Sequence, residues 1–313
     1  MSGVRERAAY LAYRAGADLA RVLPHALGDP WARSCARAMV YCWPVKRGRV
    51  ERHLVRASGG RLRGADLERS VRAVFDNYGR YWHELFRLQD QSPATVEAHF
   101  ECEGFEHLEE AAERGRGAIL ALPHLGNYDY AGRWLTLQGF PPLVVAEPVQ
   151  PPELFDWFAR TRRRLGMDVV ALGPDAGASV LRALRANRVV CLVCDRDLTG
   201  DGVPVEFFGE PTTLPAGPAA LALRTGAALL PVGTYLRPRG GHLGRILAPL
   251  DTARSGSFRA DLERVTQDLA HRFEELIAAA PEQWLLMQPN WPSDHDDAPP
   301  VAAVLGAPAT GAA

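Results

Sequence analysis

The chain has 313 residues, of which 47% are hydrophobic and 23% are charged, with a formal net charge of −1. This composition supports a large buried core in one domain, or in one domain with an appendage. Five cysteines, an odd number, argue against a disulfide framework and suit a reducing cytosol. The sequence has no apolar run of the roughly 18 to 20 residues that span a bilayer, and we expect no signal peptide.

The net charge conceals a basic N-terminal region. Residues 1–87 hold 17 Lys and Arg against 8 Asp and Glu, whereas the remainder holds 19 against 29. The segment before Pro24 has helical periodicity, with Ala8, Ala9, Leu11, Ala12, Ala15, Leu19, Val22 and Leu23 on one face and Arg7, Arg14 and Arg21 on another. A basic amphipathic helix binds membrane surfaces, because apolar burial and attraction to anionic lipid add. We expect residues 1–95 to be a basic helical, membrane-facing region, with an ordinary packed surface helix as the alternative.

Beyond residue 100, short apolar strands alternate with helical segments. We expect strands at 117–122, 143–146, 167–172, 189–193, 203–208, 228–236 and 243–248, and helices at 127–137, 153–165, 176–186, 217–224 and 257–279. This order predicts an α/β core over residues 96–293, with a mainly parallel central sheet flanked by helices. The Ala-, Pro- and Gly-rich residues 294–313 are expected to be a disordered tail.

The apolar run that ends at Leu122 leads directly into His124, followed five positions later by Asp129. In open α/β sheets, ligands bind beyond the strand ends, so a histidine there is a candidate base. If a helix starts near Asn127, Asp129 lies in its first turn and can orient the imidazole. No serine or cysteine nucleophile accompanies the pair, so the base would activate a substrate hydroxyl. The alternative is a surface pair or a satisfied core histidine.

A second polar group, Asp195-Arg196-Asp197, follows the strand at 189–193. Because both groups follow strands, we expect Asp195 and Arg196 to bind substrate in the same crevice as His124; a solvated salt bridge in a loop is the alternative. Cys191 and Cys194 lie in an apolar strand without a second cysteine pair, so we expect no metal site.

Sequence motifs spread over most of the chain carry a family resemblance. They are PHLGNYD (123–129), RRRLGM (162–167), VVCLVCDRDL (189–198), VEFFG (205–209), LPAGPA (214–219), TGAALLPV (225–232) and PEQW (281–284). The chain resembles the bacterial lipid A biosynthesis (lauroyl/myristoyl) acyltransferases of the lysophospholipid acyltransferase superfamily. Within them, the run from Cys194 to Gly217 is similar to the phosphatidylinositol mannoside acyltransferase branch.

The resemblance implies a specific reaction. A long-chain fatty acyl group of palmitoyl type would move from acyl-CoA to a sugar hydroxyl of a phosphatidylinositol mannoside glycolipid, with His124 as general base. Acyl-CoA would be a co-substrate, and neither a metal nor a bound cofactor is implied. The protein would bind peripherally to the cytoplasmic face of the cell membrane. Arg162 is expected to hold the phosphates of the acyl donor, and Glu206 is our candidate for a downstream glutamate that orients the histidine.

Two further expectations concern the transition state and the acyl chain. The backbone N–H groups of Gly126 and Asn127, at a helix N-terminus, would stabilise the tetrahedral oxyanion. An acyl groove would be lined by Trp134, Leu135, Phe207 and Phe208, although aromatic residues at such spacing more often form ordinary core.

Three alternative functions stay open. The same chemistry could act on a lysophospholipid or on a lipid A type sugar. The chain could be a non-catalytic membrane lipid-binding protein, or a thioesterase that uses water in place of the acceptor. No nucleic-acid partner is expected, because no recognised nucleic-acid module is present and the chain beyond residue 87 is acidic. The sequence does not indicate an oligomeric state.

Overall fold

A seven-stranded sheet forms the centre of the molecule, in the order β1-β9-β8-β2-β5-β3-β4. The computed structural model describes residues 2–238 and 240–294. The strands are β1 (Phe100–Glu103), β2 (Ala118–Leu122), β3 (Leu143–Ala146), β4 (Asp168–Ala171), β5 (Val189–Val193), β8 (Ala228–Leu236) and β9 (His242–Ile246). The five strands from β8 to β4 run parallel, while β9 and β1 run the other way. The predicted α/β class with a mainly parallel sheet is therefore confirmed.

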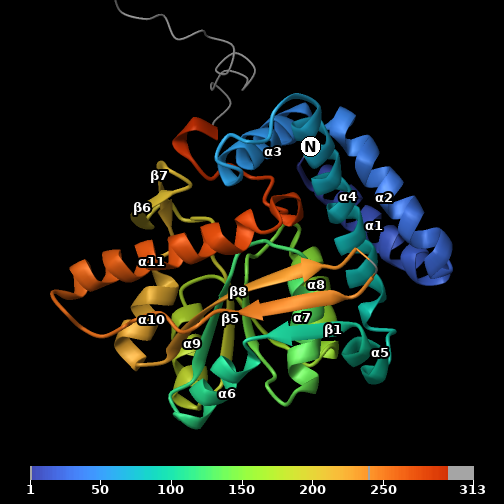
Figure 1. Ribbon diagram of the computed structural model, residues 1–313. Helices are drawn as coiled ribbons and strands as arrows, with labels where there is room; N and C mark the ends of the chain where they lie inside the picture. The colour runs from blue at the N-terminus through green and yellow to red at the C-terminus, as the bar shows by residue number, and fades with distance from the viewer. Residues whose placement is uncertain (1, 239, 295–313) are drawn as a thin grey trace, which may run out of the picture.

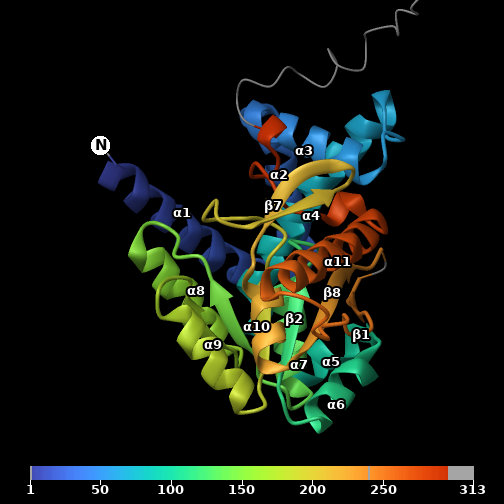
Figure 2. The same ribbon diagram turned by 90° about the vertical axis from the view of Figure 1, so that its left-hand side faces the viewer.

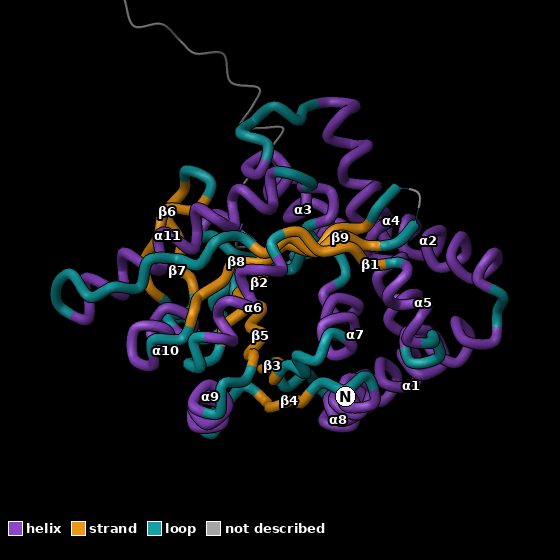
Figure 3. The backbone as a smooth tube through the Cα atoms, turned by 60° about the horizontal axis from the view of Figure 1, so that its bottom comes forward, coloured by secondary structure: helices purple, strands orange, loops and turns teal. Residues whose placement is uncertain are grey.

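Helices cover both faces of this sheet. On one face lie α9 (Ala176–Arg185), α10 (Gly217–Thr225) and α11 (Phe258–Ala278), and on the other lie α6 (Phe105–Glu113) and α7 (Tyr128–Leu137) (Figure 3). α8 (Pro152–Arg164) packs against β4. The division follows from the alternation along β2, where Ile119 and Ala121 enter one core cluster and Leu120 and Leu122 enter another. Because both faces of β2 are covered, its sequence is a continuous apolar run.

The N-terminal helices lie across the end of the sheet where the parallel strands have their carboxyl ends (Figures 1 and 2). They are α1 (Ser2–Val22), α2 (His25–Cys42), α3 (Pro44–Ala57) and α4 (Gly64–Leu88), and the short α5 (Pro93–Ala98) leads into β1. Leu54 and Phe75 of these helices share a core cluster with Leu285 and Met287, which follow α11. The first and last parts of the chain therefore pack together. The domain boundary near residue 95 stays a prediction.

Residues 203–214 form a hairpin apart from the main sheet, where the pattern predicts a single strand. β6 (Val203–Phe207) pairs antiparallel with β7 (Glu210–Leu214). Phe208 and Gly209 connect the two strands with φ angles of 52° and 75°, as a two-residue hairpin turn requires. Phe-Gly is not among the dipeptides that mark such turns in a sequence, so the sequence pattern does not predict β7.

A buried carboxylate ties the C-terminal segment to α3. The side chain of Asp294 accepts hydrogen bonds from His53 (2.9 Å), Arg52 (3.0 Å), Arg56 (3.0 Å) and the backbone N–H of Asn290 (3.0 Å). Burial opposes ionisation, but the hydrogen bond and charge of His53 and the other donors hold the pKa of Asp294 well below its usual value. The predicted disordered tail, apart from its first residue Asp294, lies outside the described residues.

We expect Asp294→Asn to lower the free energy of unfolding by about 3 kcal/mol at pH 7, because the buried cations lose their counter-charge. A carboxyl with a lowered folded-state pKa stabilises the fold above its unfolded pKa of about 4, and this contribution disappears as the pH falls through the folded value. The difference between wild type and variant should therefore shrink below about pH 4. Urea denaturation across pH measures this difference. A gap that is independent of pH would contradict the assignment.

Candidate active site

His124 and Asp195 lie side by side at the carboxyl ends of neighbouring strands. Leu122 at the end of β2 pairs with Val193 at the end of β5, and each site residue follows its strand by two positions. The Cys194 N–H donates to the Leu122 carbonyl (2.9 Å), which continues the ladder one step further. The parallel register therefore sets both side chains at the same level of the crevice where α/β sheets bind ligands.

Asp195 holds His124 through both carboxylate oxygens. Its Oδ1 is 2.6 Å from His124 Nδ1, while its Oδ2 accepts hydrogen bonds from the His124 backbone N–H (2.9 Å) and the Trp284 indole N–H (2.8 Å). The Asn290 amide donates to the Asp195 carbonyl oxygen (2.9 Å). Burial opposes ionisation of Asp195, yet the charge of His124 and these hydrogen bonds keep its pKa below the usual value. A buried, ionised carboxylate thus fixes the imidazole and leaves Nε2 for other chemistry.

The segment after α11 completes the loop that carries His124. The Leu285 N–H donates to the His124 carbonyl (2.7 Å), and the Gly126 N–H donates to the Gln283 carbonyl (3.0 Å). Gly126 has a φ of 60°, and a Cβ there would lie 2.2 Å from the Thr234 carbonyl oxygen, so only glycine fits. Because its N–H is already bonded, Gly126 is not the oxyanion donor that we expected.

The PEQW motif therefore has a structural role that sequence reasoning missed. It contributes to the family resemblance, but the spacing of its residues predicts no contact with a site 89 residues earlier in the chain. In the structure, Gln283 and Trp284 bond the histidine loop and its carboxylate.

Asp129 binds Tyr81 and Arg162 rather than His124, so the predicted partnership of His124 and Asp129 is wrong. Asp129 lies in the first turn of α7 and is 2% exposed. The Tyr81 hydroxyl donates to Oδ2 (2.7 Å), and Arg162 contacts both carboxylate oxygens (2.6 and 3.0 Å). Burial opposes the charge of Arg162, but Asp129 raises the pKa of the guanidinium above its usual value. A carboxylate removed from water needs a charged partner, and Arg162 of α8 provides it.

The side chain of Asn127 is also fully engaged. Its Oδ1 caps α7 by accepting the Tyr130 N–H (3.0 Å), and its amide donates to Glu84 of α4 (2.8 Å). Glu84 in turn binds Arg80 (2.8 Å) and lies 3.6 Å from His242. Burial lowers the pKa of His242 to about 4, so this imidazole is neutral at pH 7. The network fixes the N-terminus of α7, which begins four residues after His124.

Glu206 does not have the role that we expected for it. It is exposed on β6, where its backbone bonds the side chain of Gln267 on α11 (2.8 Å for each bond). Alternation along the hairpin buries Val205 and Phe207 and turns the Glu206 carboxylate to solvent. Glu206 therefore does not orient His124, and Asp195 occupies the position of the second carboxylate.

A cavity of about 770 Å³ opens beside His124. Its walls are mainly apolar and aromatic and come from the N-terminal helices as well as the core: Tyr13, Trp82, Leu120, Leu122, Trp134, Leu135 and Phe158. Two ion pairs also line the cavity, Arg162 with Asp129 (2.6 Å) and Arg196 with Glu147 (2.9 Å). Of the residues expected in an acyl groove, Trp134 and Leu135 line this cavity, whereas Phe207 is fully buried against Trp291 in the core. Large apolar cavities with a few polar groups are typical ligand sites.

Cys191 lies in β5, and Cys194 directly follows this strand. Cys191 and Cys194 are free thiols, and burial raises the pKa of Cys191 to about 12. A thiol with such a pKa is protonated at pH 7 and is a poor nucleophile and ligand. Within residues 2–238 and 240–294, no three His, Cys, Asp or Glu side chains gather as possible metal ligands.

Comparison with known proteins identifies the family. The model of the family described as "Bacterial lipid A biosynthesis acyltransferase" matches residues 5–293. The chain belongs to this acyltransferase family. The resemblance inferred from the motifs is therefore confirmed.

Three relatives show how much of this chain the similarity covers. The phosphatidylinositol mannoside acyltransferase of Mycolicibacterium smegmatis is 39% identical over 92% of this chain and 92% of its own length. That of Mycobacterium tuberculosis is 44% identical over 71% of this chain and 70% of its own. A lipid A biosynthesis acyltransferase of Haemophilus influenzae is 28% identical over 62% of this chain and 60% of its own. In the part of this acyltransferase that the structure describes, no helix has the length and apolarity to cross a bilayer.

We expect Arg162→Gln to lower the free energy of unfolding of this acyltransferase by about 3 kcal/mol, because Asp129 stays buried without its cation. The matched control is Arg163→Gln: Arg163 is exposed, and among the described residues its guanidinium bonds only the Val169 carbonyl (3.3 Å). We expect this control to change stability by less than about 0.5 kcal/mol. Urea denaturation compares the two variants, and equal stabilities would contradict a structural role for the ion pair.

Proposed function

We propose that the protein transfers a long-chain fatty acyl group, of palmitoyl type, from acyl-CoA to a sugar hydroxyl of a phosphatidylinositol mannoside. The observation that carries this proposal is the His124–Asp195 pair beside a large, mainly apolar cavity. Family membership supports acyl transfer, and the names of two relatives that match most of the chain support the mannoside acceptor.

In the proposed mechanism, Nε2 of His124 removes the proton of the acceptor hydroxyl as its oxygen attacks the thioester carbonyl. The tetrahedral intermediate then collapses, the carbon–sulfur bond breaks, and the imidazolium returns the proton to the leaving CoA thiolate. Asp195 stabilises the imidazolium through the 2.6 Å contact with Nδ1. No nucleophile of the enzyme is needed, because the attacking oxygen belongs to the substrate.

The remaining site residues have assigned roles in this proposal. The backbone N–H of Asn127, next to the first turn of α7, is the donor proposed for the oxyanion. Arg196, which lines the cavity and is 16% exposed at its side chain, is proposed to contact the phosphates of acyl-CoA. Arg162 lines the same cavity, and we propose that it contributes to the same phosphates while it holds Asp129.

We further propose that the protein works at the cytoplasmic face of the cell membrane, bound peripherally through its N-terminal helices. Large apolar side chains are exposed on α1, α2 and α3: Leu11, Leu19, Val22, Leu27, Trp31, Tyr41 and Val45. The sequence of these helices is also basic. Exposed apolar side chains beside cations favour binding to an anionic bilayer surface.

Labelled palmitoyl-CoA with a panel of acceptors tests the proposal. The panel contains phosphatidylinositol mono- and dimannoside, lysophospholipids and a lipid A precursor. We expect label on a mannoside, with the rate lowered about 10² to 10⁴-fold in His124→Ala, because general-base assistance is lost. Label on another acceptor would change the substrate class, and a fully active, folded His124→Ala would overturn the mechanism. Label released only as free palmitate would identify a thioesterase, and no product that depends on His124 would favour a lipid-binding protein.

Two substitutions should separate the contribution of the Asp195 carboxylate from that of the Trp284 indole N–H. We expect Asp195→Asn to lower kcat by about 10²-fold or more, because the imidazolium loses its counter-charge. Trp284→Phe removes one hydrogen bond to Asp195 and should lower kcat by about tenfold with KM for acyl-CoA unchanged. Steady-state kinetics and thermal unfolding of both variants provide the readouts. Trp284→Phe with wild-type kcat would show that the indole N–H has no part in positioning Asp195.

A further inference from the structure

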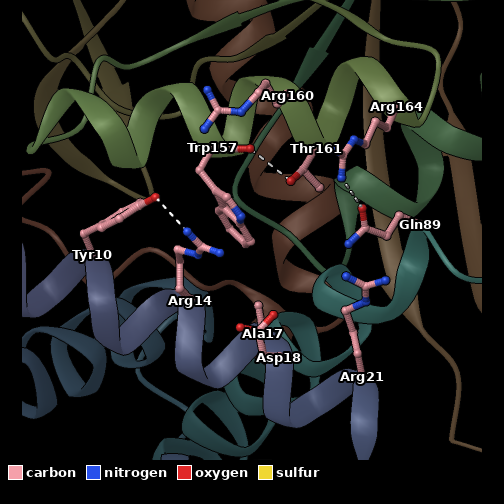
Figure 4. A pocket seen from close by; sticks show the side chains of 10 residues that line it. All are labelled: Tyr10, Arg14, Ala17, Asp18, Arg21, Gln89, Trp157, Arg160, Thr161 and Arg164. Carbon is pink, nitrogen blue, oxygen red and sulfur yellow. Dashed lines mark hydrogen bonds between the residues drawn. The ribbon is translucent and has the colours of Figure 1, made fainter.

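A second concave site lies between α1 and α8, outside the catalytic cavity. It has a volume of about 260 Å³ and is lined from both helices and from the end of α4 (Figure 4). Four arginines surround it, Arg14 and Arg21 from α1 and Arg160 and Arg164 from α8. Arg14 and Arg21 are seven residues apart, two helical turns, so they lie on one face of α1. The two helices thus present their arginines toward a shared space.

The positive charge of this arginine pocket is incompletely neutralised within the protein. Arg21 binds Asp90 through two hydrogen bonds of 2.6 and 2.8 Å. Arg14, Arg160 and Arg164 form no salt bridge with any described residue. Arg14 reaches the hydroxyl of Tyr10 at 3.4 Å, and Arg164 reaches the amide of Gln89 at 3.5 Å.

Asp18 is the one acidic side chain among the lining residues that the structure describes. Four arginines against Asp18 and Asp90 leave a surplus of two positive charges around the pocket. Clustered guanidinium groups that outnumber the neighbouring carboxylates are suited to a phosphate group, whose oxygens can accept several charge-assisted hydrogen bonds.

Apolar side chains next to the pocket indicate which kind of phosphate it takes. Leu11 and Val22 are 56% and 82% exposed on α1. They are eleven residues apart, three helical turns, and form a stripe beside that of Arg14 and Arg21. Trp157 contributes an amphipathic ring to the pocket lining, a side chain that favours the headgroup level of a bilayer. A soluble phosphate would not contact the exposed apolar side chains, whereas a lipid provides a phosphate for the arginines and hydrocarbon for the apolar side chains.

We propose that this pocket binds the phosphate of an anionic phospholipid at the membrane surface. Arg14 and Arg160 would hold the phosphate oxygens from opposite helices, while Leu11 and Val22 enter the bilayer. Tyr13 and Phe158, neighbours of the pocket on the same two helices, line the catalytic cavity and are in ring contact (5.7 Å). A lipid phosphate held by α1 and α8 would thus anchor the helices that form one wall of the cavity. This proposal rests on the proposed action at a membrane surface.

The test compares two charge-matched double variants in co-sedimentation with vesicles. Arg14→Gln/Arg160→Gln removes one arginine from each side of the pocket. Arg182→Gln/Arg185→Gln removes two exposed arginines of α9 that also form no salt bridge with described residues. With vesicles of phosphatidylinositol in phosphatidylcholine, we expect the pocket variant to bind about 25-fold more weakly than wild type, about fivefold per arginine, and the control to bind as wild type. Circular dichroism and thermal unfolding verify that both variants are folded.

Other results would overturn the proposal. Equal loss of binding in both variants would mean that diffuse positive charge, and not the pocket, attracts the membrane. Equal binding of the wild type to vesicles of pure phosphatidylcholine would mean that no anionic lipid is required. Unchanged vesicle binding with a raised KM for palmitoyl-CoA would assign the pocket to the phosphates of the coenzyme. Vesicle binding needs no turnover, so His124→Ala should bind as wild type. Failure of acyl transfer and failure of the lipid site are therefore distinguishable.

Discussion

The ionised carboxylate of Asp195, buried at the end of β5, constrains the rest of the site. A charge with no access to water must be compensated by nearby donors, and here the donors come from two distant parts of the chain. The loop after β2 supplies the imidazole and the backbone N–H of His124, and the segment after α11 supplies the indole N–H of Trp284. The register between β2 and β5 brings the Asp195 carboxylate to the His124 imidazole, because a shift of one residue would separate the two groups.

The Asp129–Arg162 pair forms a second buried charge pair beside the first, and it serves the architecture more than the imidazole. Through Tyr81, Asp129 and Arg162, it joins α4, α7 and α8, which together wall the cavity. The short His-x4-Asp spacing therefore contains two unrelated functions. His124 lines the cavity, whereas Asp129 holds together the helices that form the cavity wall.

Much of the α/β core was predictable, because strands such as 143–146 and 189–193 are apolar runs, and because Gly139 and Gly166 follow the ends of α7 and α8 with positive φ angles. The strand ends also placed Asp195 near His124. The spacing could not reveal that Asp129 binds Arg162, 33 residues later, since the placement of α8 in the folded protein decides that contact. Glu206 failed for a related reason: alternation was correctly predicted, but only the fold shows that its polar face meets solvent. The contact of Trp284 depends on the path of the chain after α11.

The docking of residues 283–285 over the histidine loop bears on how the protein is made. During synthesis, His124 and Asp195 leave the ribosome long before Trp284, because the chain emerges N-terminus first. Until the last segment arrives, the Gly126 N–H lacks the Gln283 carbonyl and Asp195 lacks the indole. A nascent or prematurely terminated chain would then hold an unfinished histidine loop. Closure of the histidine loop is thereby tied to completion of translation.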